Sequence, residues 1–207
     1  MPEFSLALQQ QNSRSGMTIE DIQKSINDHY SPLSPDCFKE LIERMEIRQV
    51  EKGSLLVKEG QYSNKSYYIV QGCARAYYVN EGRDISDWFA FEHEFISAIV
   101  SFFTDQPSLH YIEILQDSII IEISRDTINY LSEKYHDFER LIRVVVTNTM
   151  LSQRERISSI LFHTAEEKYE QMLTIRPDIV QRVPLMHIAS YLGMTLETLS
   201  RIRKLKN

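Results

Sequence analysis

The side chains whose types and spacing most clearly suggest a function lie close to the last residues of the chain, and most of them are polar. They share or flank one face of a short helix expected after Gly193, and comprise Thr195, Leu196, Glu197, Thr198, Ser200, Arg201, Arg203 and Lys204. Arg can bridge the O6 and N7 atoms of guanine, and Glu can accept a hydrogen bond from N4 of cytosine. Threonine hydroxyls at a helix N-terminus suit phosphates, and the last cations attract the phosphate backbone without reading sequence. The pattern predicts a surface that binds double-stranded DNA.

The residues just before this face fit a helix-turn-helix motif in register. The first helix is expected from about Pro184 to Leu192, with Ala189 where the two helices cross closely. Gly193 falls at the turn, where a positive φ is wanted, and Thr195 falls at the N-cap of the second helix. The positions expected to be buried are Ile188, Leu192, Met194, Leu199 and Ile202. An ordinary helical hairpin is the alternative, since a basic helix end also complements the helix dipole.

Composition and charge limit the classes of function. The 207 residues are 43 % hydrophobic and 25 % charged, as in a soluble globular protein, and carry a net charge of −6. Residues 164–207 hold seven Lys or Arg against five Asp or Glu, a net charge of +2, so the remainder carries −8. No apolar run approaches the roughly 20 residues that span a bilayer, and no signal peptide is recognisable. We therefore expect a cytoplasmic protein with a dedicated basic module and no membrane partner.

Histidines and cysteines form no grouping that predicts an active site or a metal centre. Cys37 and Cys73 are far apart and fit no metal-ligand spacing, so each is expected as a buried, reduced thiol. A metal-dependent cupin enzyme is a competing interpretation, but the stretch FEHEF offers one His between two acids. Glu92, His93 and Glu94 are instead expected as exposed surface residues. No catalytic residue, metal ligand or cofactor is predicted.

Hydrophobic periodicity predicts the elements that position these side chains. Residues 1–16 show little periodicity and are expected to be a leader or a disordered tail. Two amphipathic helices follow, one with Ile19, Ile22 and Ile26 on a single face and the next with Phe38, Leu41, Ile42 and Met45. Six short β-rich runs then follow between Val50 and Ser124, separated by turns such as NEGR at 80–83. The runs are SLLVKEG, SYYIVQG, CARAYYV, DISDWFAF, HYIEIL and SIIIEIS. Strands of this length and spacing predict an antiparallel β-roll.

A long helix is expected after the roll. Apolar and small residues step by three or four along it, and those assigned to a dimer contact are Phe138, Leu141, Ile142, Val145 and Thr149. This stripe is expected to pack against the same helix of a second subunit. The alternatives are that it lies across its own roll, or does both. Thr164 and Glu167 have the form of a capping box, so a new helix is expected to begin after His163.

The predicted fold class is therefore α+β, and three parts are expected after the leader. An antiparallel β-roll (jelly-roll) domain is expected at 17–135, a dimerisation helix at 136–163 and a helix-turn-helix domain at 164–207. The last part offers no evident β-hairpin wing after Lys204.

The order of these parts resembles the Crp/Fnr family of bacterial transcription regulators. The stretches that carry the resemblance are KGSLLVKEG, NKSYYIVQGCARAYYV and IASYLGMTLETLSRIRK. The family implies a homodimer on an inverted-repeat DNA site, RNA polymerase as a further partner, and a ligand in the roll that alters the pose of the recognition helices. Glu197 and Arg201 sit where the family has its base-reading Glu and Arg, whereas Leu196 replaces another reading Arg.

The expected ligand site departs from the pattern of the cyclic-nucleotide binders. Ala98 stands where that resemblance places the ribose-binding Glu, Ser108 where it places the phosphate-binding Arg, and Leu109 where it places a Ser. Asn148 and Ser152 lie where long-helix residues of the family meet the ligand; alternatively, they only set helix register. A phosphate buried without its cation would be poorly compensated, so cyclic AMP is not expected to bind in the usual mode. The sequence does not identify an effector. A ligand-free roll whose interior is filled by side chains fits the sequence at least as well as a roll that binds a different ligand.

Two functions thus compete on the sequence. The first is a dimeric, sequence-specific DNA-binding regulator. The second is a signalling module that binds a small apolar ligand and a protein partner, with the terminal helices as its docking surface.

Overall fold

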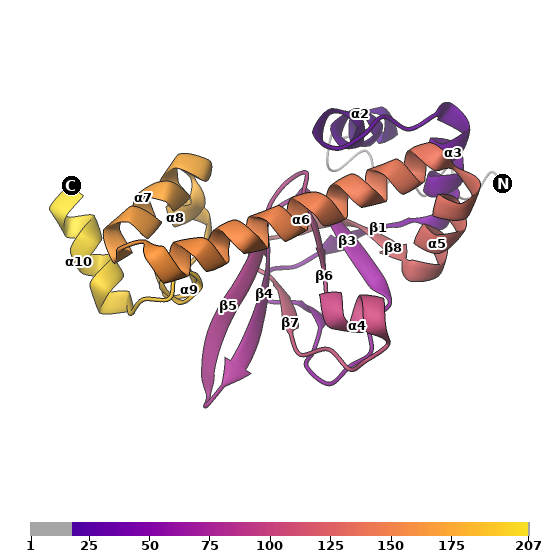
Figure 1. Ribbon diagram of the computed structural model, residues 1–207. Helices are drawn as coiled ribbons and strands as arrows, with labels where there is room; N and C mark the ends of the chain where they lie inside the picture. The colour runs from indigo at the N-terminus through magenta and orange to yellow at the C-terminus, as the bar shows by residue number, and fades with distance from the viewer. Residues whose placement is uncertain (1–17, 207) are drawn as a thin grey trace.

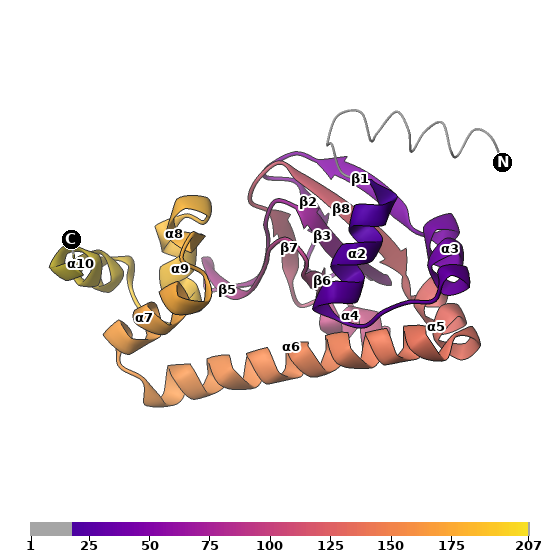
Figure 2. The same ribbon diagram turned by 90° about the horizontal axis from the view of Figure 1, so that it is seen from above.

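The computed structural model describes residues 18–206, so the expected leader at 1–16 lies outside the described residues. Two helices come first, α2 (Ile19–His29) and α3 (Pro35–Arg44). Thr18 and Asp21 form a capping box at the start of α2. Both helices lie over one side of the strands that follow (Figures 1 and 2).

The strands form two four-stranded antiparallel sheets, which confirms the predicted roll. The first sheet has the order β1-β8-β3-β6 and contains β1 (Glu46–Val50), β8 (Ser118–Ser124), β3 (Lys65–Gln71) and β6 (Phe95–Ser97). The second has the order β2-β7-β4-β5 and contains β2 (Leu55–Val57), β7 (Tyr111–Ile114), β4 (Ala74–Asn80) and β5 (Arg83–Ala90). A short helix, α4 (Ile99–Thr104), follows β6.

Two strands of the first sheet are buried on both faces. The inner face of this sheet contributes Ile69 and Ile120 to the core between the sheets, and both side chains are fully buried. Its outer face contributes Tyr68 and Ile121 to a second core formed with the N-terminal helices. Double burial explains why the stretches SYYIVQ and SIIIEI are nearly continuous runs of large side chains.

Two strands were not predicted from the sequence. β1 begins at Glu46, directly after α3, so Met45 lies outside the helix in which the periodicity placed it. Most of the β1 side chains are exposed or half-buried, and β6 has only three residues. Neither strand therefore carries a strong hydrophobic pattern. The NEGR turn is confirmed between β4 and β5, where Glu81 and Gly82 both have positive φ.

The remaining elements are helices. They are α5 (Arg125–Lys134), α6 (His136–Phe162), α7 (Ala165–Ile175), α8 (Ile179–Arg182), α9 (Leu185–Tyr191) and α10 (Leu196–Lys206). The 27-residue α6 crosses the molecule from the N-terminal helices to the C-terminal ones (Figure 1). Thr164 and Glu167 form the predicted capping box at the start of α7. The last four helices share a core that includes Tyr169, Met172, Ile188 and Leu199.

Candidate functional site

The side chains assigned to DNA from the sequence lie on or beside the outward face of α10. Leu199 and Ile202 bury the inner face of this helix, whereas Glu197, Arg201 and Lys204 are exposed. Thr195 and Leu196 are exposed as well, and Thr198, Ser200 and Arg203 are half-buried at the edges. α10 lies at the end of the molecule farthest from α2 and α3 (Figures 1 and 2). The structure thus brings the eight predicted residues together on one accessible helix.

The turn before α10 has the predicted local geometry. Gly193 has a φ of +64°, and the amide of Met194 donates to the carbonyl of Ala189 at 3.0 Å. The hydroxyl of Thr195 accepts from the amide of Thr198 at 3.2 Å, as expected of an N-cap. Pro184 lies one residue before α9 rather than inside it. Hydrogen bonds from its own amide and from Thr195 hold the pKa of Glu197 below its usual value, so this carboxylate is ionised at neutral pH.

The face of α6 that was predicted to be a dimer contact is turned toward the chain's own core, and another face of this helix is exposed to solvent. Phe138 and Leu141 are fully buried in the chain's own core, and Ile142 and Val145 pack against that core. Thr149 is half-buried, and its hydroxyl donates to the carbonyl of Val145 at 2.9 Å. The assignment of Phe138 and Leu141 to a subunit contact is therefore wrong for this conformation. Their face lies across the roll, where it covers the outer side of the first sheet.

An adjacent face of α6 carries a second apolar stripe that the sequence analysis did not separate from the first. We call its members, Val146, Met150, Ile157 and Leu161, the exposed stripe, and each is 44 to 66 % exposed. Their spacings of 4, 7 and 4 residues place them on one side of a helix. No apolar residue of the described part of the chain covers this side, because both cores of the roll lie on the other face.

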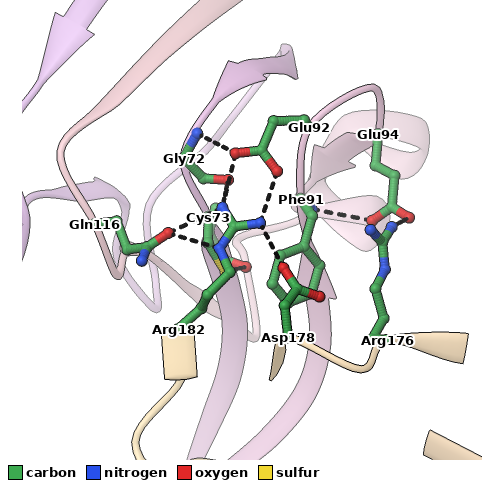
Figure 3. A network of polar contacts seen from close by, with 10 residues as sticks. Gly72, Cys73, Phe91, Glu92, Glu94, Gln116, Arg176, Asp178 and Arg182 are labelled. Carbon is green, nitrogen blue, oxygen red and sulfur yellow. Dashed lines mark hydrogen bonds and ion pairs between the residues drawn. The ribbon is translucent and has the colours of Figure 1, made fainter. Parts of the chain in front are cut away.

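The C-terminal helices dock on the roll through a shared apolar cluster, which includes Phe89 and Phe91, and through buried and half-buried charges. Arg182 of α8 donates to both carboxylate oxygens of Glu92, at 2.7 and 2.8 Å, and to the carbonyl of Gly72 at 2.9 Å. It also donates to Gln116 Oε1 and to Asp178 (Figure 3). Burial alone would raise the pKa of Glu92, but the hydrogen bonds from Arg182 and the Gly72 amide outweigh it and lower the pKa. The network thus joins α8 to three separate turns of the roll.

A second arginine, from the roll itself, reaches into α9. Arg75 of β4 is only 1 % exposed and donates to Glu113 at 2.7 Å and to Asp84 at 3.1 Å. Its Nη1 also donates to Nδ1 of His187 on α9 at 2.7 Å. Since a guanidinium can only donate, His187 must accept here and is neutral. Burial, followed by the charge of Arg75, lowers the pKa of His187 and favours this form.

The acidic turn between β5 and β6 is therefore not the plain surface segment that was expected. Glu92, His93 and Glu94 are all half-buried, Glu92 pairs with Arg182, and Glu94 pairs with Arg176. His93 has a φ of +70°, which is rare for a residue other than glycine. Its ring stacks on His29 with centroids 4.2 Å apart. The alternation FEHEF signals a turn, but nothing local to it identifies arginines some 80 to 90 residues away.

A cleft of about 460 Å³ opens between the roll, α6 and the C-terminal helices. Its walls include Trp88 and His93 from the roll, Asn148 and Ser152 from α6, and Lys168 from α7. We call it the interdomain cleft. Two of the five residues predicted for a ligand pocket, Asn148 and Ser152, therefore face this space. The other three, Ala98, Ser108 and Leu109, are not part of its walls.

The middle of the chain matches one known protein family. Residues 47–135 match the cyclic nucleotide-binding domain. The matched range runs from β1 to the residue before α6, and so comprises the roll with α4 and α5. No curated protein matches the sequence closely enough to count as a relative.

Solved structures extend the similarity to most of the chain. FixK2 from Bradyrhizobium japonicum is 17 % identical, with a TM-score of 0.65 over 78 % of this chain and 83 % of its own. The c-di-GMP-responsive global regulator CLP from Xanthomonas campestris is 14 % identical, with a TM-score of 0.65 over 84 % and 92 %. The catabolite activator protein from Thermus thermophilus is 13 % identical, with a TM-score of 0.54 over 87 % and 85 %. These matches to Crp/Fnr regulators, all of low identity, show the fold.

The interior of the cyclic nucleotide-binding domain is filled by side chains. Ala98, at the start of α4, is 1 % exposed and belongs to the core between the sheets, with Ile96 and Ile112. The hydroxyl of Ser108 is buried and donates to the carbonyl of His110 at 2.9 Å. Leu109 is 54 % exposed and lines no interior space. The structure thus separates the residues predicted as one pocket into the domain's core, its surface and the interdomain cleft.

No group of three or more His, Cys, Asp or Glu side chains in residues 18–206 could hold a metal ion. None of the helices described there is long and apolar enough to cross a membrane. Cys37 and Cys73 are both buried, and burial raises the pKa of each thiol to about 12.

Proposed function

We propose that the chain is a sequence-specific DNA-binding transcription regulator of the Crp/Fnr type. It acts as a homodimer on an inverted-repeat site, and its roll does not bind cyclic AMP in the usual mode. The observation that carries the proposal is the outward face of α10. This face presents Glu197, Arg201 and Lys204 to solvent on a helix whose start is capped by Thr195.

The chemistry of this face supports base reading. Arg201 and Glu197 lie one helical turn apart and offer a donor fork and an acceptor, which suit guanine and cytosine edges in the major groove. The half-buried Arg203 and the exposed Lys204 follow and suit phosphates. The similar solved structures include two that are named as a global regulator and a catabolite activator protein. The α9–α10 unit is thus proposed as a helix-turn-helix, with RNA polymerase as a further partner.

The exposed stripe supports the homodimer. Four large apolar residues at helical spacing on a 27-residue helix have no cover within residues 18–206. A second copy of the same helix would bury them in a parallel pair along a two-fold axis. Such a pair would place two copies of α10 at one end of the assembly, as an inverted repeat requires.

The filled interior supports the absence of cyclic AMP. The positions that would hold the ribose and the phosphate are Ala98 and Ser108, and neither supplies a charge. The space between the sheets is occupied by buried side chains such as Ile69, Ile112 and Ile120. A cyclic phosphate placed there would lose its hydration without a compensating cation.

Selection of random DNA by the purified full chain, without added ligand, tests the proposal. The expected result is an enriched inverted repeat whose half-sites lie about one helical turn, roughly 10 base pairs, apart. Affinity for that repeat should fall steeply as salt rises, because phosphate contacts release counterions. Salt-insensitive binding to a protein partner, with no enriched DNA, would favour the signalling module instead.

The same DNA site allows a test of the outward face of α10. The double variant Glu197→Ala with Arg201→Ala should weaken specific binding at least about tenfold, since each good base contact contributes roughly 1–3 kcal/mol. It should leave the oligomeric state unchanged. The matched control, Lys39→Ala with Glu43→Ala, removes the same pair of charges from the exposed side of α3. Equal losses in both double variants would contradict the assignment of α10.

A further inference from the structure

The wall of the interdomain cleft contains one largely buried lysine whose ammonium group pairs with no residue in the described range. Lys168 of α7 is 8 % exposed, and the structure records no ion pair or side-chain hydrogen bond for it within residues 18–206. The other cations around the cleft are paired. Arg156 lies 3.2 Å from Asp87, Arg176 pairs with Glu94, and Arg182 pairs with Glu92. Each of these arginines is thus neutralised by its own carboxylate partner, whereas the charge of Lys168 is not paired.

The stem of this side chain is buried, but Lys168 Nζ is not among the buried side-chain atoms that lack a hydrogen-bond partner, so the ammonium group reaches the solvent of the cleft. Lys168 lies beside Tyr169 and Met172, which belong to the core of the C-terminal helices. Glu155 is the acid of the cleft wall that pairs with no other residue in the described range, but it is exposed on α6 and therefore well solvated. The position of the ammonium on the cleft wall leaves the cleft itself as the place for a compensating charge.

The wall formed by α6 supplies neutral donors. Asn148 lies one turn before Ser152 and Gln153, and none of the three side chains hydrogen-bonds to another residue in the described range 18–206. Amide and hydroxyl groups of this kind fix the orientation of a polar ligand and do not require it to be charged. These side chains would donate hydrogen bonds to oxygen atoms of a bound ligand that lie too far from the ammonium group of Lys168.

The remaining walls combine apolar side chains with paired charges such as Glu92, Glu94 and Arg176. Val145, Met172 and Ile175 contribute aliphatic surface, and Phe89 and Tyr191 contribute aromatic rings whose centroids lie 5.2 Å apart. Cavities of roughly 300–1,000 Å³ with mostly apolar walls and a few polar groups are typical of small-molecule sites. The volume of about 460 Å³ lies within that range.

We propose that the interdomain cleft binds a small organic anion with an apolar body. Its acidic group pairs with Lys168, its body lies between Tyr191 and the aliphatic side chains, and Asn148 and Ser152 hydrogen-bond to its polar atoms. The site is distinct from the interior of the cyclic nucleotide-binding domain and does not depend on DNA binding. An occupant would contact the roll, α6 and the C-terminal helices at once, so it would favour the docked arrangement of these parts.

A pair of fluorescent probes tests the proposal on the full chain. They are 8-anilinonaphthalene-1-sulfonate, an aromatic anion, and N-phenyl-1-naphthylamine, the same body without the sulfonate. We expect saturable binding of the anion at one site per chain, with quenching of Trp88, the only tryptophan in the sequence, which lines the cleft. The anion should bind about tenfold more tightly than the neutral probe, the gain expected of a charge-assisted hydrogen bond.

Variants identify the site. Lys168→Met should remove the preference for the anion, Lys168→Arg should keep it, and Lys39→Met, on the exposed side of α3, should change nothing. Ser152→Trp, which fills the cleft from the exposed side of α6, should weaken both probes and serves as the deciding variant should Lys168→Met fail to fold. Equal affinity for both probes in the wild type, or anion binding unchanged by Lys168→Met and Ser152→Trp, would overturn the proposal. Unchanged binding would point to the exposed stripe as the site of the probe.

Discussion

At Gly72 the absence of a single Cβ atom allows the roll to connect with the C-terminal helices. Its φ is +105°, and a Cβ added there would lie 2.0 Å from the hydroxyl oxygen of Ser118 and 2.9 Å from its Cα. The Gly72 amide donates to Glu92, and its carbonyl accepts from Arg182. The glycine therefore serves a close backbone approach as well as a positive φ.

Replacing Gly72 by alanine should destabilise the chain by about 3 kcal/mol or more, because left-handed strain adds to a clash with backbone atoms. Denaturant unfolding would measure the loss. Gly53→Ala is the matched control, since Gly53 has a φ of +83° and nothing within 4 Å of an added Cβ. That variant should lose only about 1–2 kcal/mol. Similar losses in the two variants would show that the approach to Ser118 is not tight.

His187 makes the docking of α9 dependent on pH. Its folded-state pKa is lowered from the usual 6.5 by burial and by Arg75, while Glu113 and Asp84 oppose the shift. Its contribution to stability is therefore complete above pH 6.5 and is lost as the pH falls from there through the lowered pKa. His187→Asn keeps an acceptor for Arg75 but does not titrate near neutral pH.

The measurement for His187 is thermal unfolding between about pH 7.5 and pH 5. The wild type should lose stability over this range more steeply than His187→Asn. His93, whose pKa is also lowered, titrates in both proteins, so its effect cancels in the comparison. Parallel curves would contradict the role given to His187.

Among the elements, α6 shows how one helix can serve two partners. One face, with Phe138 and Leu141, covers the roll, and the exposed stripe lies on the adjacent face. Periodicity detects apolar residues at helical spacing but does not say which of two neighbouring stripes turns inward. The choice depends on the shape of the surface below, which includes Tyr68 and Ile121 of the roll.

Met150→Glu, in the exposed stripe, should dissociate the proposed homodimer without unfolding the chain, because it would bury a charge in an apolar contact. Leu151→Glu is the matched control: Leu151 is 47 % exposed but lies on another side of α6. Sedimentation velocity at several concentrations would distinguish monomer from dimer. Dissociation by both variants, or by neither, would count against the exposed stripe as the subunit contact.

At the scale of the whole molecule, charged and apolar residues together hold the C-terminal helices against the roll. Arg182, Arg176 and Arg75 each join two parts that lie far apart in the sequence. The amide of Ser86 adds a hydrogen bond to the hydroxyl of Ser190 at 2.9 Å. Phe89, Phe91 and Leu115 of the roll also share a buried apolar cluster with the C-terminal helices, so the interface is of mixed character. Interfaces between domains of one chain that are not wholly apolar permit relative motion, so we expect this one to move when the pose of α10 changes.

Arg182→Gln should weaken the docking by about 1–3 kcal/mol, the value of charge-assisted hydrogen bonds to a half-buried carboxylate. Hydrogen exchange would detect it as loss of protection in residues 84–90 and 185–191, including the amide of Ser86. Arg143→Gln is the control, because Arg143 pairs with Glu139 at 3.9 Å on an exposed surface, where an ion pair contributes about 0–1 kcal/mol. Unchanged exchange in Arg182→Gln would show that the docking rests on other contacts.

Local chemistry alone was enough to predict several parts of this molecule. The capping box at Thr164, the turn at Gly193 and the α10 face that carries Glu197 and Arg201 depend on residues within one or two helical turns of each other. The strands of the roll were also predictable where they are long, because double burial demands runs of large side chains. β1 and β6 were not predicted. β1 is largely exposed and β6 has only three residues, so neither has a strong hydrophobic pattern.

Only the tertiary structure decided the contacts between distant residues. Glu92 and Arg182 lie 90 positions apart, and Arg75 and His187 lie 112 apart, so no periodicity within one element relates them. The separation of Asn148 and Ser152 from Ala98 and Ser108 likewise depends on how α6 crosses the roll. Short-range patterns report backbone preference and the burial of one face, whereas the pairing of charges and the cleft around Lys168 arise only when separate elements pack together.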